Sequence, residues 1–519
     1  MIVGIVLLVL LCVLVLVGLR TAFALPHSGG PQFGTAPDQT TPHFAPRLAA
    51  LVARHQQQTG VYALSDGQEA LACRLSLIAL AQTCIDIQYY IWNNDLSGQL
   101  ILNAILVAAD RGVRVRIIVD DNTTSATETL WAATAQHPNI AICLFNPLRI
   151  RRPRSINYLI DFVRINRRMH NKCLLVDGQA CIVGGRNIGN EYFSSQVGMH
   201  FFDLDLLAVG AVVPDVAASF DEYWRCESVY DAKGLLAGLK NASLPKLRSD
   251  LTAQLNSDDG KDLMQLLADF KFAARFKKAN LALEWTMAEL VVDNPKKGRG
   301  KIPRRDLMVG KLTEILQKAE HNLNIASAYF VPGVQGTRFL TRLSRRGVVV
   351  QVLTNSLSSN VVLPVHAGYA RYRKKLLKGK VDLFELKINR REKSPPEVIT
   401  RRIRRKFWAS SSSLHAKVFV VDRQDVLISS FNFDPRSTYL NCEMGILVHS
   451  PKMARAVLDI IADNISHTAY RPLLLNKYRL VWLDMQSRPM EVLGREPDTR
   501  FGKRFLLWCV SWLPLEWLL

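Results

Sequence analysis

A pattern of polar residues occurs twice in this chain of 519 residues. Each copy reads His-x-Lys, four residues, Asp, six residues, a pair of small residues, one residue and Asn. The first copy comprises His170, Lys172, Asp177, Gly184, Gly185 and Asn187, and the second comprises His415, Lys417, Asp422, Ser429, Ser430 and Asn432. One His-x-Lys pair is weak evidence, whereas a long pattern repeated with the same spacing indicates shared chemistry.

The pattern suits chemistry at a phosphate group. Alternate residues of a strand face the same side, so His170 projects with Lys172, and His415 with Lys417. A lysine carries positive charge suited to phosphate oxygens. One neutral imidazole can attack phosphorus while a second, protonated imidazole protonates the leaving oxygen. The two motifs together therefore predict displacement through a phosphohistidine, and we favour His170 as the nucleophile.

The Asn and Asp residues of the motifs have different expected roles. Asn187 and Asn432 follow small residues, so their amides can approach and donate to the phosphate oxygens. Asp177 and Asp422 lie five residues beyond their lysines, an odd offset that removes them from the same strand face. The catalytic motif includes both Asp residues, and we expect them to orient or stabilise the site at a turn rather than to attack.

A nucleophilic histidine needs its second ring nitrogen anchored. Asp203 and Glu443 each lie at the start of an apolar run after their motif, at comparable points. We expect each carboxylate to accept a hydrogen bond from the histidine of its own half, with Asp205 as a rival for Asp203. The sequence contains no convincing cluster of metal ligands, so we expect no metal and no cofactor.

Other polar and aromatic residues carry less specific signals. His366 and Tyr369, in a helix-like run, are undecided between helix packing and contact with the substrate. Core packing is the expectation for four aromatic residues in or after apolar runs: Tyr89, Tyr90, Trp92 and Tyr329.

The segments that must position the motifs are also duplicated. Residues 84–92 and 113–119 read as strands separated by a helix-like run that ends at Gly112. The same order of strand, helix and strand is repeated later: residues 323–331 and 348–353 read as strands, and the helix-like run between them ends at Gly347. The pairs Tyr89-Tyr90 and Tyr329-Phe330 fall at matching points in this comparison. Alternating strands and helices indicate an α/β fold built from two related halves.

The N-terminus is strongly apolar. Residues 2–19 carry no charge, and 18 residues of helix span roughly 27 Å, enough to cross a bilayer core. No basic residue precedes the run, which favours a retained anchor over a cleaved signal. The first basic residue, Arg20, follows the run and favours a cytoplasmic catalytic part. The family resemblance described below implies that the anchoring membrane is a bacterial inner membrane.

These observations predict an ordered series of segments. They are an anchor over 1–25, a linker over 26–47, a first α/β domain over 48–245, an irregular inter-domain linker over 246–305, a second α/β domain over 306–475, and a C-terminal segment over 476–519. The nine cysteines are scattered without a CxxC pair, which favours buried thiols and a reducing compartment.

Charge and composition favour an anionic partner. The net charge is +21, and basic runs at 149–154 and 401–408 precede the two motifs. The C-terminal sequence FLLWCVSWLPLEWLL suits a bilayer interface, and docking on the core is equally open. Charge alone does not choose among nucleic acid, a membrane surface and a phosphorylated substrate. The resemblance described next implies phospholipid substrates and a membrane as partners, no nucleic acid, and a monomer whose single site uses both motifs.

The duplicated His-x-Lys-x4-Asp pattern with its downstream Asn resembles the phospholipase D superfamily. That resemblance implies two duplicated phospholipase-D-like α/β domains, each a mixed sheet flanked by helices, packed about a pseudo-twofold with one site between them. The runs HAGYARYRKKLL, VVDNPKK and LPLEWLL look like bacterial cardiolipin synthases of the C type. This narrower resemblance implies transfer of a phosphatidyl group from phosphatidylethanolamine or phosphatidylglycerol to phosphatidylglycerol.

Three alternatives remain open at this stage. A phospholipase D hydrolase would use the same residues with water as the acceptor and would release phosphatidic acid. A phosphodiesterase acting on DNA is the second alternative, against which the apolar ends of the chain argue. A membrane scaffold on an inactive fold is the third, and it predicts loss of motif residues, whereas both copies are complete.

Overall fold

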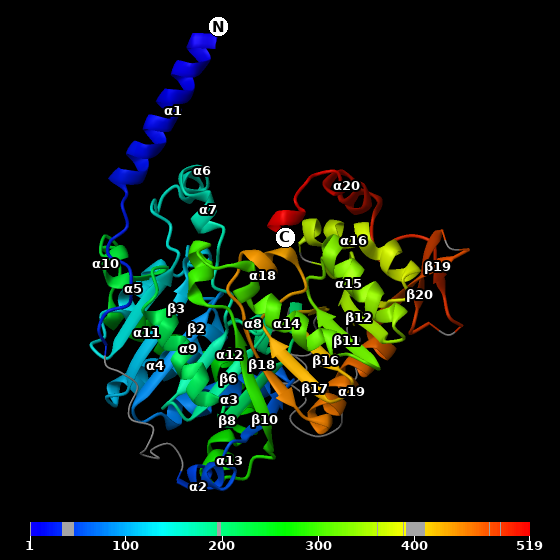
Figure 1. Ribbon diagram of the computed structural model, residues 1–519. Helices are drawn as coiled ribbons and strands as arrows, with labels where there is room; N and C mark the ends of the chain where they lie inside the picture. The colour runs from blue at the N-terminus through cyan, green and yellow to red at the C-terminus, as the bar shows by residue number, and fades with distance from the viewer. Residues whose placement is uncertain are drawn as a thin grey trace.

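The computed structural model describes residues 2–33, 46–194, 199–360, 362–387, 389–390, 411–476, 478–487 and 489–519. Part of the expected linker, 34–45, and the basic run 401–408 lie outside the described residues. The described chain forms a mixed α/β body from which one N-terminal helix extends (Figure 1).

The first half is built on a mixed sheet whose strands follow the order β9-β4-β3-β2-β5-β6-β8-β1. Strands β2, β3 and β4 are parallel neighbours, and the remaining pairs are antiparallel. The strands are β1 (Thr59–Leu64), β2 (Cys84–Tyr89), β3 (Arg114–Asp120), β4 (Ile140–Phe145), β5 (Cys173–Val176), β6 (Ala180–Gly184), β8 (Asp205–Gly210) and β9 (Val229–Asp231).

The second half repeats this arrangement in the order β10-β18-β17-β16-β11-β12-β13 and continues through β19, β20 and β21. The strands are β10 (Glu284–Val292), β11 (Asn322–Ser327), β12 (Val349–Asn355), β13 (Asp382–Leu386), β16 (Lys417–Val421), β17 (Asp425–Ser429), β18 (Met444–His449), β19 (Ala469–Leu475), β20 (Arg479–Asp484) and β21 (Val492–Leu493). The second sheet therefore extends past residue 475, the expected end of the second domain.

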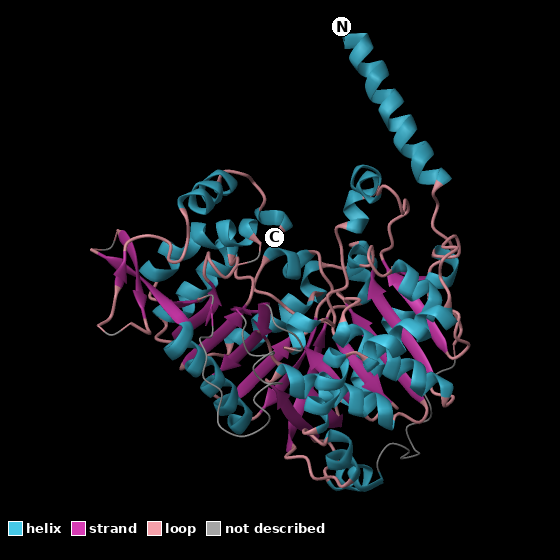
Figure 2. Cartoon of the chain, turned by 180° about the vertical axis from the view of Figure 1, so that it is seen from behind, coloured by secondary structure: helices cyan, strands magenta, loops and turns pink. Residues whose placement is uncertain are grey.

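The two sheets join where the equivalent strands β1 and β10 pair antiparallel, with Gly60 opposite Trp285. Antiparallel pairing of equivalent strands relates the halves by an approximate twofold rotation at this seam, and the joined sheet runs through both halves (Figure 2). A trio of short strands also crosses between the halves: β7 (Met199–Phe202), β14 (Asn389–Arg390) and β15 (Ser411–Leu414).

Helices cover both faces of the joined sheet. One face of the first half packs on α3 (Gly67–Leu80), α4 (Leu96–Asp110) and α5 (Glu128–Thr134), and that of the second half on α14 (Met308–Gln317), α15 (Gly333–Arg345) and α16 (Leu363–Lys378). The other face packs on α9 (Val213–Trp224) and α19 (Pro451–Thr468) within one hydrophobic cluster that contains strand residues of both halves. This shared core fixes the halves relative to each other.

The segment 246–305 is ordered, which differs from the expected irregular linker. It contains α11 (Leu244–Asn256), α12 (Asp258–Ala268) and α13 (Phe272–Lys277), followed by β10. The helices bury Leu251, Leu263 and Phe276 in the core of the first half, while β10 is a strand of the second sheet. Packing of their apolar faces against the first half stabilises these helices.

The two ends of the chain lie on the same side of the molecule (Figure 1). Helix α1 (Ile2–Ala22) projects from the body, and Arg149 Nη1 donates to the carbonyl of Phe23 at 3.3 Å. No helix within the described residues combines the length and apolar character needed to cross a membrane. The C-terminal helix α20 (Phe501–Ser511) packs on α16, and the last residues form a short 3-10 helix over Glu516–Leu518.

Asp177 and Asp422 occupy equivalent hairpin turns in left-handed conformations, with φ of 51° and 49°. The carboxylate of each accepts hydrogen bonds from three successive backbone N–H groups that enter the first parallel strand of its sheet. The donors are Gln82, Thr83 and Cys84 for Asp177, and Glu320, His321 and Asn322 for Asp422. Both Asp residues thus tie the motif hairpin to β2 or β11, in agreement with a stabilising role.

We expect Asp177→Ala to lower the free energy of unfolding by about 3 kcal/mol, because buried N–H donors lose their charged acceptor. Asp177→Asn retains a carbonyl acceptor and is expected to lose less. Chemical denaturation gives the stability, and turnover per folded molecule should stay near that of the unaltered protein. Loss of turnover at unchanged stability would instead place Asp177 in the chemistry.

Candidate active site

The two motif histidines enter the site along strands of the opposite half. The backbone N–H of His170 donates to the carbonyl of Cys442 at 2.8 Å, and the backbone N–H of Cys442 donates to the carbonyl of Arg168. The backbone N–H of His415 donates to the carbonyl of Phe202 at 2.8 Å, where β15 runs parallel to β7. Each histidine therefore lies beside the segment that leads into the other half's carboxylate.

The histidine–carboxylate pairs cross between the halves. Nδ1 of His170 lies 2.8 Å from Oε2 of Glu443, and Nδ1 of His415 lies 2.5 Å from Oδ2 of Asp203. The sequence identified the right carboxylates, but the expected pairing within each half is wrong. The crossed strands bring each carboxylate next to the histidine of the other half. Asp205, the rival candidate, is instead paired with Arg74 at 2.7 Å.

The small pair of each motif serves the carboxylate of its own half. A Cβ atom on Gly185 would lie 2.1 Å from Oδ1 of Asp203, so only glycine leaves room for that carboxylate. In the second half, Ser430 Oγ donates to Glu443 at 2.5 Å, and Ser437 Oγ donates to the other carboxylate oxygen at 2.9 Å. The serine pair of the second motif thus supplies a hydrogen bond where the first motif supplies space.

Both histidines are held in the neutral state. Burial lowers the pKa of His170 to about 4 and that of His415 to about 3. The pKa of Glu443 falls to about 2, and that of Asp203 lies well below its usual range, because nearby cationic and histidine groups outweigh burial. An ionised carboxylate only accepts hydrogen bonds, so each Nδ1 carries a proton and each Nε2 keeps its lone pair.

The two lysines are buried beside the histidines. Lys172 Nζ donates to the carbonyl of His170 at 2.7 Å, and Lys417 Nζ contacts both the carbonyl and the ring of His415. Burial lowers the pKa of Lys172 well below its ordinary value and that of Lys417 to about 8, and Lys172 is also repelled by the charge of Lys417. An anionic phosphate between them would offset that repulsion.

The two motif asparagines occupy equivalent positions. Oδ1 of Asn187 accepts from Ile91 N–H at 3.2 Å, and Oδ1 of Asn432 accepts from Tyr329 N–H at 3.4 Å. The buried Nδ2 of Asn187 has no hydrogen-bond partner among the described residues, so it can donate to a ligand. Ile91 and Tyr329 are therefore the matching pair, and the expected match of Tyr89 with Tyr329 is displaced by two residues.

Aromatic rings form walls around the histidines. Tyr90 packs edge-on against His170 at 5.1 Å between centroids, with Lys172 Nζ 5.6 Å from its ring centre. Tyr192 and Phe201 each lie 5.1 Å from the ring of His415. The expectation of core packing is wrong for Tyr90, and its place directly after β2 does not by itself distinguish a core ring from one beside a motif histidine. These rings restrict water around the imidazoles.

Core packing does describe Tyr89 and Trp92, whereas Tyr329 belongs to none of the hydrophobic clusters formed by the described residues. Tyr89 is buried and accepts from Arg74 at 3.1 Å, and Trp92 packs edge-on against the buried Trp131. Tyr329 is largely enclosed, which raises its pKa to about 12 through burial.

His366 and Tyr369 belong to helix packing. His366 Nε2 lies 2.9 Å from Arg373, and Tyr369 OH donates to Glu385 at 2.9 Å within the second half. Both side chains are buried in this network, which also contains Glu496. The described contacts therefore resolve their open assignment in favour of packing.

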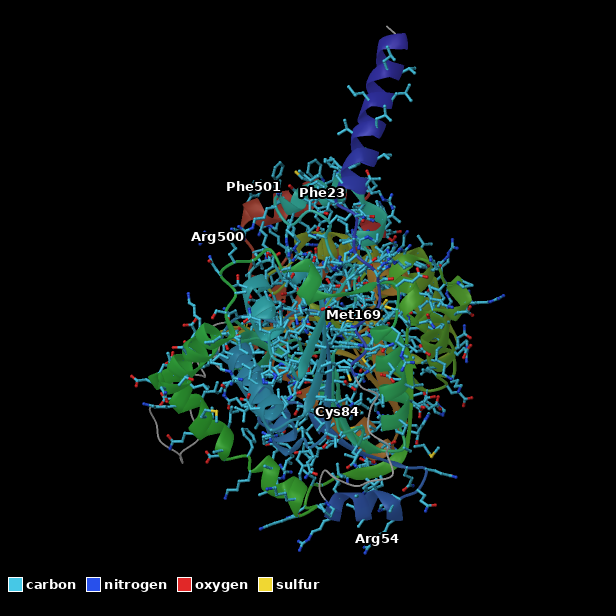
Figure 3. All side chains as sticks on the ribbon, turned by 90° about the vertical axis from the view of Figure 1, so that its left-hand side faces the viewer. Phe23, Arg54, Cys84, Met169, Arg500 and Phe501 are labelled. Atoms are coloured by element: carbon cyan, nitrogen blue, oxygen red, sulfur yellow. The ribbon has the colours of Figure 1, made fainter. Side chains whose placement is uncertain are left out.

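The remaining predicted groups lie away from the histidines. Asp177 is five residues beyond Lys172 along β5, about 16 Å at the rise of a strand. Figure 3 shows Met169 near the middle of the molecule and Cys84, whose backbone N–H donates to Asp177, toward the lower end.

In the basic run 149–154, Arg151 and Arg154 form ion pairs with Asp121 and Glu128 rather than projecting free. Within the described chain, no group of three or more His, Cys, Asp or Glu is arranged for a metal ion.

This geometry supports nucleophilic attack on the phosphorus atom of an anionic phosphate group. Two neutral imidazoles present unprotonated Nε2 atoms, while lysine ammonium and asparagine amide groups lie beside them. Each carboxylate is placed to stabilise the imidazolium that forms when its histidine takes up a proton. The site therefore contains a nucleophile, an acid–base partner and charge stabilisation.

Comparison with known proteins identifies related chains. Residues 75–224 and 312–463 match the family model described as "Cardiolipin synthase, PLD-like domain". Cardiolipin synthase C of Escherichia coli K12 is 40% identical over 479 residues, covering 92% of this chain and 100% of that protein. An uncharacterized protein of Helicobacter pylori strain 26695 is 33% identical, covering 85% of this chain and 86% of its own.

A solved structure shows the same fold across most of the chain. The phosphatidylserine synthase of Haemophilus influenzae Rd KW20 superposes with a TM-score of 0.56 at 13% sequence identity. The match covers 91% of this chain and 99% of that chain. The likeness supports the two-half α/β architecture described above.

The crossed pairing is testable through the imidazole signals in nuclear magnetic resonance. We expect Asp203→Asn to lower the pKa of His415 further and leave that of His170 nearly unchanged, because a neutral amide no longer stabilises the imidazolium. Glu443→Gln should show the reverse selectivity. If Asp203→Asn instead shifted His170 alone, pairing within each half would hold in solution.

Proposed function

The chain belongs to the family of cardiolipin synthases with phospholipase-D-like domains, and we propose that it moves a phosphatidyl group between phospholipids through a phosphohistidine. It is an enzyme of the phospholipase D superfamily and a phosphatidyltransferase resembling cardiolipin synthase. The main support for the proposed mechanism is the pair of histidines, each of which is anchored by a carboxylate of the other half.

In the first proposed step, Nε2 of His170 attacks the phosphorus of the donor phospholipid. A bound phosphate anion favours the protonated form of His415, so its Nε2 takes up a proton when the lipid binds. A phosphorus–nitrogen bond then forms, the bond to the headgroup oxygen breaks, and the His415 imidazolium gives its Nε2 proton to that oxygen. Lys172, Lys417 and the two asparagine amides balance negative charge on the phosphoryl oxygens. We keep His170 as the expected nucleophile, although the two histidine–carboxylate pairs are nearly equivalent in geometry.

In the second step, a hydroxyl of phosphatidylglycerol attacks the phosphohistidine while His415 removes its proton. The phosphorus–nitrogen bond breaks, and cardiolipin leaves with both histidines restored. A phosphatidylethanolamine donor releases ethanolamine, whereas a phosphatidylglycerol donor releases glycerol. The aromatic walls of the site favour a lipid hydroxyl over water by limiting solvent.

The donor and the reaction type are tested with labelled phosphatidylethanolamine, with and without phosphatidylglycerol. We expect labelled cardiolipin when both lipids are present, and His170→Ala and His415→Ala should each reduce its formation by at least about a thousandfold. Peptide mapping of the phosphorylated species at high pH, where the phosphorus–nitrogen bond survives, would identify the attacking histidine. Phosphatidic acid as the only lipid product would indicate a hydrolase, and appreciable turnover in either single variant would contradict the two-histidine scheme.

We also propose that the protein works on the surface of a bacterial cell membrane as a monomer, since one chain supplies both motifs. Exposed apolar side chains gather on segments at the end of the molecule from which α1 projects (Figure 1). Leu159 of α6 (Asn157–Ile160) and Val163 of α7 (Phe162–Ile165) are 76% and 73% exposed, and Trp512 after α20 is 73% exposed. Such clusters favour an apolar surface as partner.

Binding to vesicles of phosphatidylethanolamine and phosphatidylglycerol tests this association. We expect Phe505→Ser combined with Trp508→Ser and Trp512→Ser to weaken sedimentation with vesicles by at least about tenfold, because less apolar area enters the lipid. Met287→Ser on β10 removes a comparably exposed apolar side chain elsewhere and should bind normally. Equal binding by the two variants would show that α20 does not contribute to membrane binding.

A further inference from the structure

A cavity of about 950 Å³ lies in the second half, between α14, α15, α18 (Pro435–Tyr439) and the C-terminal segment. Its size is at the upper end of the range of roughly 300–1,000 Å³ typical of ligand pockets. Most of its wall is apolar, including Leu312, Leu316, Phe339, Phe433 and Trp517. None of the residues that line it belongs to the catalytic pairs described above.

The C-terminal segment forms the roof of this cavity. The carbonyl of Leu519 accepts from the backbone N–H of Arg436 at 2.5 Å, and Glu516 accepts from Tyr372 OH at 2.8 Å. Trp517, 58% exposed, packs edge-on against Phe162 of the first half at 6.1 Å between centroids. The roof therefore lies beside α7 and close to the exposed apolar residues of α20 (Figure 1).

Helix α18 lies between the cavity and the catalytic centre. Pro435 and Thr438 line the cavity, while Ser437 on the same helix donates to Glu443 at 2.9 Å. Glu443 in turn holds Nδ1 of His170 at 2.8 Å. One short helix therefore connects the wall of the cavity to the carboxylate that anchors His170.

The charged groups of the wall are already engaged. Asp434 accepts from Ser437 N–H at 2.7 Å, and Arg371 donates to the carbonyl of Leu513 at 2.9 Å. Glu516 accepts from Tyr372 OH and lies 3.8 Å from Arg371. The wall thus offers apolar contact rather than a charge for a polar ligand, and a hydrocarbon chain fits that chemistry.

We propose that this cavity binds an acyl chain of a phospholipid substrate while the phosphate of that lipid lies between His170 and His415. The inference rests on the proposed function for the identity of the lipid, and it adds a second point of attachment. Binding of the chain contributes apolar burial that does not change during the reaction, so it sets selectivity for chain length.

Filling the cavity tests the proposal. Thr313 lines the cavity from α14, and the neighbouring Glu314 faces solvent on the same helix. We expect Thr313→Trp to lower kcat/KM for dioleoyl phospholipid by about tenfold and to leave the rate with dioctanoyl phospholipid nearly unchanged. Glu314→Trp, the matched control, should keep the normal ratio of the two rates. An unchanged ratio in folded Thr313→Trp would overturn the proposal.

A second measurement uses the unaltered protein and does not require turnover. A phosphatidylglycerol with a photoreactive group at the end of one acyl chain should label peptides containing Phe339 or Trp517, and dioleoyl phosphatidylglycerol should compete. Labelling confined to α20 or to the motif peptides would overturn the cavity assignment. If the unaltered protein made no cardiolipin yet labelled these peptides, the proposed function would fail while the acyl-chain site would stand.

Discussion

The site depends on an exchange of carboxylates across the seam between the halves. Glu443 anchors His170 and Asp203 anchors His415, so neither half contains a complete histidine–carboxylate pair. The exchange requires the antiparallel β1–β10 junction and the crossed segments around Cys442 and Phe202. The shared hydrophobic cluster beneath both sheets maintains that relation, so the packing of the whole body determines the geometry of four side chains.

Electrostatics explains why this buried arrangement suits an anionic substrate. When the imidazoles are neutral, the negative charges of the two ionised carboxylates balance the positive charges of the two lysines. Burial nevertheless disfavours the lysine charges, as the lowered pKa of Lys417 shows. The phosphodiester anion of the proposed substrate would offset that cost by approaching both lysines.

Much of the local structure was accessible from the chain alone. Alternation of apolar residues located β2, β3, β11 and β12, and the odd spacing of Asp177 from Lys172 correctly assigned it to a turn. The segment 246–305 was misjudged because its helices are stabilised by contacts with the first half. Tyr90 was misjudged for a related reason: an aromatic side chain after a strand has the same local signature in a core and beside a catalytic histidine.

The sequence by itself determined which residues form the motifs, because duplicated spacing constrains which side chains share a strand face. It also identified Asp203 and Glu443 as the anchoring carboxylates, through their equivalent places before apolar strands. Only the tertiary structure decided which carboxylate holds which histidine, and it reversed the expected pairing. The physical reason is that a pseudo-twofold makes the two choices equivalent in local sequence, and only contacts between residues more than 200 positions apart distinguish them.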